Sequence, residues 1–87
     1  MVFYKVVLSK QVRKKDIPKI PIKDRQKVVH IIGDLAKDPR PKSASKLTNR
    51  AEYKIRYRNY RILYLVEDVV KIVEVRRVML RGEDYKT

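Results

Sequence analysis

The chain has 87 residues, which fits a single domain over residues 1–87 and leaves no room for a second core. Its 23 Lys and Arg against 10 Asp and Glu give a formal net charge of +13, which favours a polyanionic partner or an acidic protein. The absence of cysteine excludes disulfides and thiolate metal sites. With no signal-peptide pattern and no bilayer-length apolar stretch, we expect a cytoplasmic protein without a membrane partner.

The chain opens with a predicted strand and a short basic helix. Val2–Leu8 is rich in β-branched and aromatic residues, a composition typical of a strand. Ser9 follows at a natural N-cap position. Lys10–Ile17 then predicts a helix, which we expect Pro18 to end.

The clearest helical pattern comes next. Apolar residues within Val28–Ala36 repeat with the spacing of one helix face. Asp24 is expected in the first turn and Lys37 in the last turn, where each charge agrees with the helix dipole. The following stretch, Lys42–Arg50, is read as a polar connection.

Glu52–Glu67 predicts a β-hairpin, because aromatic and aliphatic residues alternate with basic ones. The simplest register has a two-residue turn at Arg58-Asn59, with asparagine supplying the left-handed backbone angle. This register pairs Tyr57 with Tyr60, Ile55 with Ile62, Tyr53 with Tyr64 and Arg56 with Arg61.

The last predicted strand is Val69–Val75, after a tight turn at Glu67-Asp68. It is apolar on both faces, so we expect a central or covered strand that ends at Arg76 and Arg77. The predicted fold is α+β with the order β-α-α-β-β-β. Its sheet is small and mostly antiparallel, and its two N-terminal helices pack on one face.

The hairpin register brings three cations, Lys54, Arg56 and Arg61, onto one face without an acid in register. Like charges directly opposite each other destabilise a sheet, which favours a face that binds a polyanion or an acidic partner. The alternative is an ordinary solvated sheet face. His30 lies off the apolar helix face and is read as a surface residue.

The residue types leave little catalytic chemistry open. One histidine and scattered carboxylates give no metal-ligand pattern, no Gly-rich loop is present to hold a nucleotide, and no serine has a histidine to activate it. RNA carries its own nucleophile, the 2′-hydroxyl group. Arginine can stabilise the charge on the reacting phosphate, and a lysine among cations, Lys54, can take a proton. The residues do not separate RNA cleavage from tight RNA binding.

Two segments resemble the RelE/ParE superfamily of bacterial and archaeal toxins. They are Lys46-Leu47 and Tyr53–Tyr64, which match the family's "K-L" anchor followed by "Y-R/K-I-R", a short turn and "Y-R-hydrophobic-hydrophobic-Y". Leu35–Pro41 also looks like the end of the family's helix. The resemblance implies a compact fold with a basic concave surface. In the RelE branch this surface cleaves mRNA in the ribosomal A site without a metal or cofactor, and a cognate antitoxin silences it.

The resemblance also implies roles for individual residues. Lys54 and Arg56 correspond to basic residues implicated in proton transfer and charge stabilisation, and Arg61 to an arginine that contacts the phosphate. RelE-type enzymes add an arginine near the end of the last strand and a tyrosine in the tail. Arg76, Arg77 and Arg81 compete for the first role, and Tyr85 matches the second. Further RNA contacts are expected from Lys46, Arg50, Arg58 and Arg76.

Two other functions remain open at this stage. The ParE branch shares the fold and inhibits DNA gyrase without cleaving RNA, and a member of the fold can bind RNA without catalysis. A RelE-like branch that uses glutamate and a C-terminal histidine is disfavoured, because the tail contains no histidine. The combination of Lys54, Arg56, Arg61 and Tyr85 favours the RelE branch.

Overall fold

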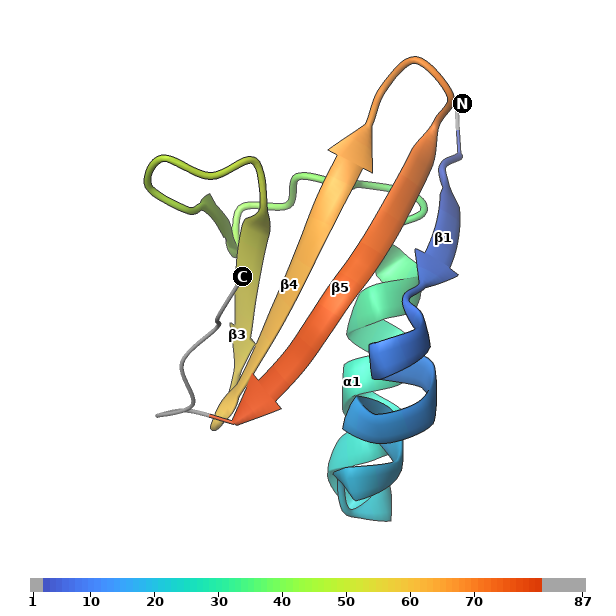
Figure 1. The fold of residues 1–87 in the computed structure, drawn as a ribbon, viewed down its shortest axis with the longest axis vertical. Helices are drawn as coiled ribbons and strands as arrows, with labels where there is room; N and C mark the ends of the chain where they lie inside the picture. The colour runs from blue at the N-terminus through green and yellow to red at the C-terminus, as the bar shows by residue number, and fades with distance from the viewer. Residues whose placement is uncertain (1–2, 81–87) are drawn as a thin grey trace.

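The computed structural model describes residues 3–80, which form a five-stranded sheet with helical segments on one side (Figure 1). The elements are β1 (Lys5–Leu8), the π-helical turn η1 (Val12–Asp16), the 3₁₀ turn η2 (Ile17–Lys19), α1 (Ile22–Asp34), β2 (Ala44–Lys46), β3 (Tyr53–Tyr57), β4 (Tyr60–Glu67) and β5 (Ile72–Leu80). The predicted α+β class and the order of the predicted elements are confirmed. The structure adds β2, a three-residue strand within the stretch that was read as a polar connection.

The strands lie side by side in the order β1-β5-β4-β3-β2. β1 runs parallel to β5 and pairs Lys5 with Ile72, whereas the other neighbouring strands are antiparallel. β5 therefore has a neighbour on each side, which agrees with its prediction as a central strand. The strand pairs β3–β4 and β4–β5 carry the surface described below.

The first helical segment is capped as predicted. The Val12 N–H donates to the Ser9 hydroxyl oxygen at 3.2 Å, which satisfies a donor at the helix start. The prediction that Pro18 ends this segment is wrong, because the chain continues through Lys19 as a 3₁₀ turn. Pro18 is tolerated there because it occupies one of the first positions of the 3₁₀ turn, where a backbone N–H would have no partner within the turn.

α1 packs its apolar face against the sheet through Val28, Ile32 and the adjoining Leu35, all buried. Asp24 lies in its first turn, as predicted. The placement of Lys37 in the last turn is wrong. At the end of α1 the backbone N–H groups of residues 35–37 bond to the carbonyl three residues earlier, as in a 3₁₀ turn. Leu35 is buried there, and Lys37 lies in the turn that follows the helix.

The predicted hairpin register is confirmed in every pair. The turn differs in one respect, because Arg58 takes the left-handed conformation (φ 53°) that we expected of Asn59. A non-glycine residue in this conformation carries a modest steric cost. The Arg58 Nε–H donates to the Tyr57 hydroxyl at 3.2 Å, and the Arg58 guanidinium lies over the Tyr57 ring. Both contacts hold the Arg58 side chain against the hairpin.

The last strand begins and ends later than predicted. A turn occupies residues 68–71, with Lys71 at φ 57°, and β5 then runs to Leu80. Val69, which the prediction placed in the strand, is 95% exposed in that turn. Arg76 and Arg77 consequently lie inside β5 and do not end it. Apolar character alone could not separate turn from strand in this segment.

The core lies between the helical segments and the sheet. Tyr60, Ile62 and Tyr64 of β4 point into it together with Val73 and Val75 of β5. The Tyr64 hydroxyl donates to the Pro39 carbonyl at 2.8 Å, and burial raises the pKa of this tyrosine above its usual range. Within residues 3–80, no helix is both long and apolar enough to cross a membrane.

Candidate nucleic-acid interface

Three basic side chains share the sheet face that lies opposite the core. Tyr53, Ile55 and Tyr57 of β3 face the core, so Lys54 and Arg56 face the other way. Arg61 is the cross-strand partner of Arg56. We call this surface the hairpin face and define it by Lys54, Arg56 and Arg61.

Strand pairing sets these cations close together. Residues directly opposite on antiparallel strands have Cβ atoms about 4.5–5.5 Å apart, which applies to Arg56 and Arg61. Within the described residues, none of the three cations of the hairpin face has a hydrogen-bond or ion-pair partner. The described part of the fold, residues 3–80, therefore holds these positive charges together without a neutralising partner.

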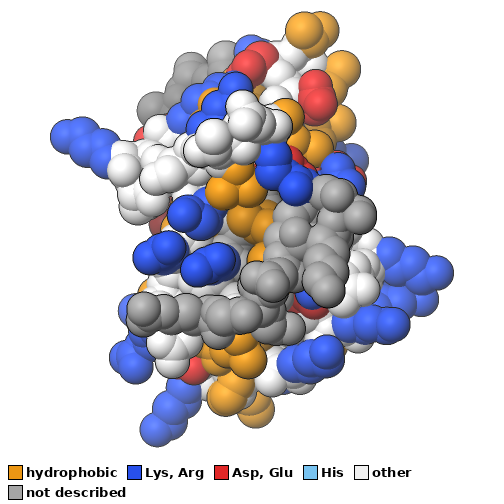
Figure 2. Space-filling model, turned by 60° about the vertical axis from the view of Figure 1, so that its left-hand side comes forward, with side chains coloured by type: hydrophobic (Ala, Val, Ile, Leu, Met, Phe, Trp, Pro, Cys, Tyr) orange, Lys and Arg blue, Asp and Glu red, His pale blue; other side chains and the backbone are white. Residues whose placement is uncertain are grey.

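Apolar residues form the floor beside these charges. Leu63 pairs with Lys54, and Met79 pairs with Arg61, yet both apolar side chains are only 2% exposed. Figure 2, which brings the β3 side forward, shows Lys and Arg side chains gathered around a strip of hydrophobic side chains. A small hollow of about 40 Å³ opens next to Arg56 and Arg61 at the hairpin turn. A phosphate group approaching this hollow would meet the guanidinium donors of Arg56, Arg58 and Arg61.

The other basic residues predicted to bind RNA lie in different settings. Lys46 pairs with Tyr53, so the register places it on the core side of the sheet and not on the hairpin face. Arg50 forms an ion pair with the buried Glu52 at 3.2 Å. Arg58 lies in the hairpin turn and lines the small hollow, while Arg76 lies 3.7 Å from Glu74 in β5. Arg81 and Tyr85 lie outside the described residues.

Of the two competing arginines that the structure describes, Arg76 and Arg77, it is Arg77 that comes nearer the hairpin face in the strand register. It pairs with Leu63, which itself pairs with Lys54 on the next strand. Its guanidinium Nε donates to Asp16 at 3.0 Å. Asp16 was not singled out in the sequence, although a lone acid after three consecutive cations in a helix was a usable signal.

A second charged group was also missed by sequence reasoning. Arg40 binds Asp68 through both carboxylate oxygens, at 3.0 and 2.8 Å, and donates to the Tyr53 hydroxyl at 2.9 Å. Tyr4 donates to the same carboxylate at 2.8 Å. We call this group the Arg40–Asp68 clamp, and it ties the segment after α1 to the turn between β4 and β5.

The Arg40–Asp68 clamp makes the stability of the fold depend on pH in the acid range. Hydrogen bonds from Arg40, and then from Tyr4, lower the pKa of Asp68 from 3.8 to about 2. Because the pKa is lower in the folded protein, the carboxylate stabilises the fold fully at pH values above its pKa in the unfolded chain. This stabilisation is lost as the pH falls towards the folded-state pKa of about 2. Asp68→Asn should therefore lower the urea midpoint at pH 7 by a small amount, since the pair is exposed.

The gap in urea midpoint between the wild type and Asp68→Asn should close between about pH 4 and about pH 2. Asp34→Asn is the matched control, because Asp34 is an exposed carboxylate that forms an ion pair with His30 and takes no part in the clamp. A gap that persists unchanged at pH 2 would contradict the role given to the clamp.

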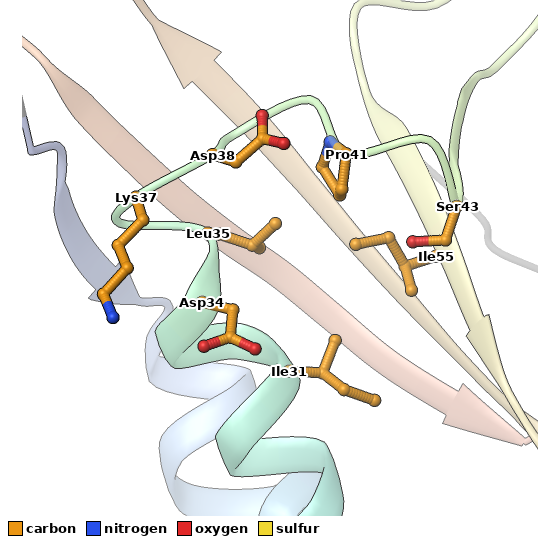
Figure 3. Close-up of a pocket in the computed structure, with 8 residues that line it drawn as sticks. All are labelled: Ile31, Asp34, Leu35, Lys37, Asp38, Pro41, Ser43 and Ile55. Carbon is orange, nitrogen blue, oxygen red and sulfur yellow. The ribbon is translucent and has the colours of Figure 1, made fainter.

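An apolar cavity lies away from these charges. It occupies about 380 Å³ between the end of α1 and β3 on the core side of the sheet, next to Ile31, Leu35 and Ile55 (Figure 3). Two carboxylates, Asp34 and Asp38, also line it. Lys37 lines the cavity as well, but two carboxylates and an apolar wall do not suit a phosphate. Within residues 3–80, no three His, Cys, Asp or Glu side chains gather as metal ligands would.

Comparison with known families decides the class of the protein. The family model for the ParE toxin of type II toxin–antitoxin systems, parDE, matches residues 6–85. The chain belongs to the ParE toxin family. It is thus a toxin of a type II toxin–antitoxin system, and the predicted membership of the RelE/ParE superfamily is confirmed. None of the curated proteins compared with this ParE-family chain matches it.

Solved structures show that this ParE-family chain has the fold of RelE toxins. A chain of the RelBE2 toxin–antitoxin complex from Mycobacterium tuberculosis is 29% identical, with a TM-score of 0.80 over 92% of this chain and 100% of that one. A chain of the archaeal RelE–RelB complex from Pyrococcus horikoshii is 22% identical, with a TM-score of 0.78 over 95% of this chain and 100% of that one. The isolated E. coli RelE toxin is 22% identical, with a TM-score of 0.78 over 93% and 87%.

Proposed function

We propose that this toxin cleaves mRNA in the ribosomal A site. The observation that carries the proposal is the pairing of Arg56 with Arg61 beside Lys54, without a neutralising partner among residues 3–80. Such a surface has an unfavourable self-energy that a bound phosphodiester relieves. The match to the RelE fold supports the same assignment, because the RelE branch is the one associated with mRNA cleavage.

The chemistry needs no group beyond the RNA and the protein. The 2′-hydroxyl oxygen attacks the adjacent phosphorus, the bond from phosphorus to the 5′-oxygen breaks, and a 2′,3′-cyclic phosphate and a 5′-hydroxyl end result. Lys54 takes the proton of the 2′-hydroxyl. Arg56 and Arg61 donate to the phosphate oxygens as negative charge builds on them in the transition state. Tyr85 is proposed as the group that returns a proton to the leaving oxygen.

The test is to add the purified toxin to ribosomes programmed with a defined mRNA and to map the RNA ends. Cuts within the A-site codon that leave cyclic phosphate ends are expected. The same mRNA without ribosomes should remain largely intact, since the proposal places the substrate in the A site. Intact mRNA on programmed ribosomes, with a toxin that still arrests growth, would contradict the proposal.

Inhibition of DNA gyrase is the second candidate function, and the matched family model favours it. That function would use the basic surface to bind protein or DNA without any cleavage of RNA. A supercoiling assay with purified gyrase separates the two functions. A loss of supercoiling together with intact mRNA would support the gyrase function.

We also propose a cognate antitoxin and a cytoplasmic location, where the ribosome and its mRNA are found. Several similar structures, including those from M. tuberculosis and P. horikoshii, are toxin–antitoxin complexes. For this chain, a net charge of +13 favours an antitoxin with acidic residues and an amphipathic segment. We expect the antitoxin gene beside the toxin gene, and co-expression of a short acidic protein encoded there should restore growth.

A further inference from the structure

The edge of β5 next to β1 is completed by side chains and not by a strand. β1 ends at Leu8, so it pairs with β5 only as far as Val75. Beyond that point Ser9 and Asp16 take over. The Ser9 hydroxyl donates to the Arg76 carbonyl at 3.0 Å, and the Val78 N–H donates to Asp16 at 2.9 Å. The polar backbone of β5 is thereby satisfied along an edge that has lost its neighbouring strand.

A β-bulge in β5 decides where Arg77 lies. The neighbours Leu63 and Tyr64 pair with Arg77 and Val75, so Arg76 is the extra residue. Without the bulge, Arg77 would continue the alternation of Val73 and Val75 and face the core. With it, Arg77 joins the row of Leu63 and Lys54. Bulges commonly redirect a side chain near a functional site.

Asp16 then fixes the direction of the Arg77 side chain. The Asp16 residue is 5% exposed and is held by Gln11, whose amide donates to its other oxygen at 3.0 Å. It accepts the Nε–H of Arg77 and the backbone N–H of Val78 on one oxygen. Among the described residues, the two Nη groups of Arg77 have no partner. When a guanidinium is held at Nε, its two Nη groups remain available to bind two oxygens of another acceptor, such as a phosphate.

We infer that Asp16 is a positioning residue, which holds Arg77 by Nε so that its Nη groups can bind a substrate phosphate beside the hairpin face. The inference rests on the proposed RNA-cleaving function and adds a residue to that site. Asp16 itself touches no substrate. Its effect on cleavage therefore passes entirely through Arg77, and this dependence can be measured.

A double-mutant cycle tests the dependence with four proteins: wild type, Asp16→Asn, Arg77→Ala and the double variant. Asparagine keeps an oxygen for the Val78 N–H but loses the charge that holds Arg77. The single-turnover rate of mRNA cleavage on ribosomes should fall about 10- to 100-fold in Asp16→Asn. In the Arg77→Ala background the same change should alter the rate less than about twofold. Asp34→Asn, which removes an exposed acid elsewhere, should cleave like wild type.

Two results would overturn the inference. One is an equal fall in rate in both backgrounds, which would mean that Asp16 acts on the fold as a whole. The other is an unchanged rate in a folded Asp16→Asn protein. If Asp16→Asn does not fold, Gln11→Ala loosens the same carboxylate more gently, and its smaller effect should likewise vanish in the Arg77→Ala background.

The result of the mutant cycle can be told apart from the result of the test for mRNA cleavage. A wild-type protein that cuts no mRNA contradicts the proposed cleavage, and the cycle is then read from the affinity of the four proteins for a labelled single-stranded RNA. Asp16→Asn should still weaken that affinity only when Arg77 is present. Equal weakening in both backgrounds would reject the positioning role in this assay as well.

Discussion

Arg61→Ala should abolish growth arrest and slow mRNA cleavage on ribosomes by about 100- to 1,000-fold. Arg61 pairs with Arg56 at the hollow of the hairpin turn, so its loss removes one of the guanidinium groups proposed to bind the phosphate. These donors act most strongly in the transition state, when the phosphate carries its extra charge. The fall should therefore appear in the cleavage rate more than in ribosome binding. End mapping of the mRNA measures it directly.

The same variant should fold at least as well as wild type. Like charges directly opposite each other destabilise a sheet, and Arg61→Ala removes such a pair. Lost activity with a retained or raised unfolding midpoint would show that the arginine serves binding and not the fold. Arg13→Ala, at an exposed site on η1, removes the same charge as a control and should stay toxic. An Arg61→Ala protein with full toxicity would place the site elsewhere.

Ile62→Ala should have the largest effect on stability. Ile62 is fully buried in β4 between Ile55 and Val78, and truncation of such a residue costs about 2–5 kcal/mol. A domain of this size is stable by only about 5–15 kcal/mol in total. The melting temperature should fall by about 8 °C or more. Circular dichroism during heating measures the shift.

Val29→Ala is the matched control, because Val29 is 48% exposed on α1. It should change stability by no more than about 0.5 kcal/mol. Toxicity of the Ile62→Ala protein at low temperature should persist, since the variant leaves the hairpin face untouched. Equal melting temperatures for the two variants would mean that β4 does not form the core as described.

The hairpin could be predicted from sequence because its signals are local. Alternation of tyrosine and isoleucine with basic residues fixes the faces, and a two-residue turn fixes the register, so Lys54, Arg56 and Arg61 followed directly. The start of β5 could not be predicted in the same way. Val69 and Val70 are as apolar as a strand residue, but the turn of residues 68–71 leaves them exposed.

The position of the Arg77 side chain could not be predicted from the sequence, for a different reason. Its position depends on a one-residue bulge at Arg76 and on a bond to Asp16, which is 61 residues away in the chain. No short window contains both partners. The Arg40–Asp68 clamp was missed for the same reason, because its residues meet only after the sheet has formed. Local patterns thus identify the hairpin face, and tertiary pairing completes its surroundings.

The parallel pairing of β1 with β5 determines how early in synthesis the sheet can be completed. A ribosome makes β1 long before β5, which is the strand that pairs with it among residues 3–80. Contacts between such distant segments form late and slowly. The sheet edge at Lys5–Leu8 thus stays unpaired while the chain is being made. A protein proposed to attack translation therefore completes its own fold only after its synthesis has passed β5.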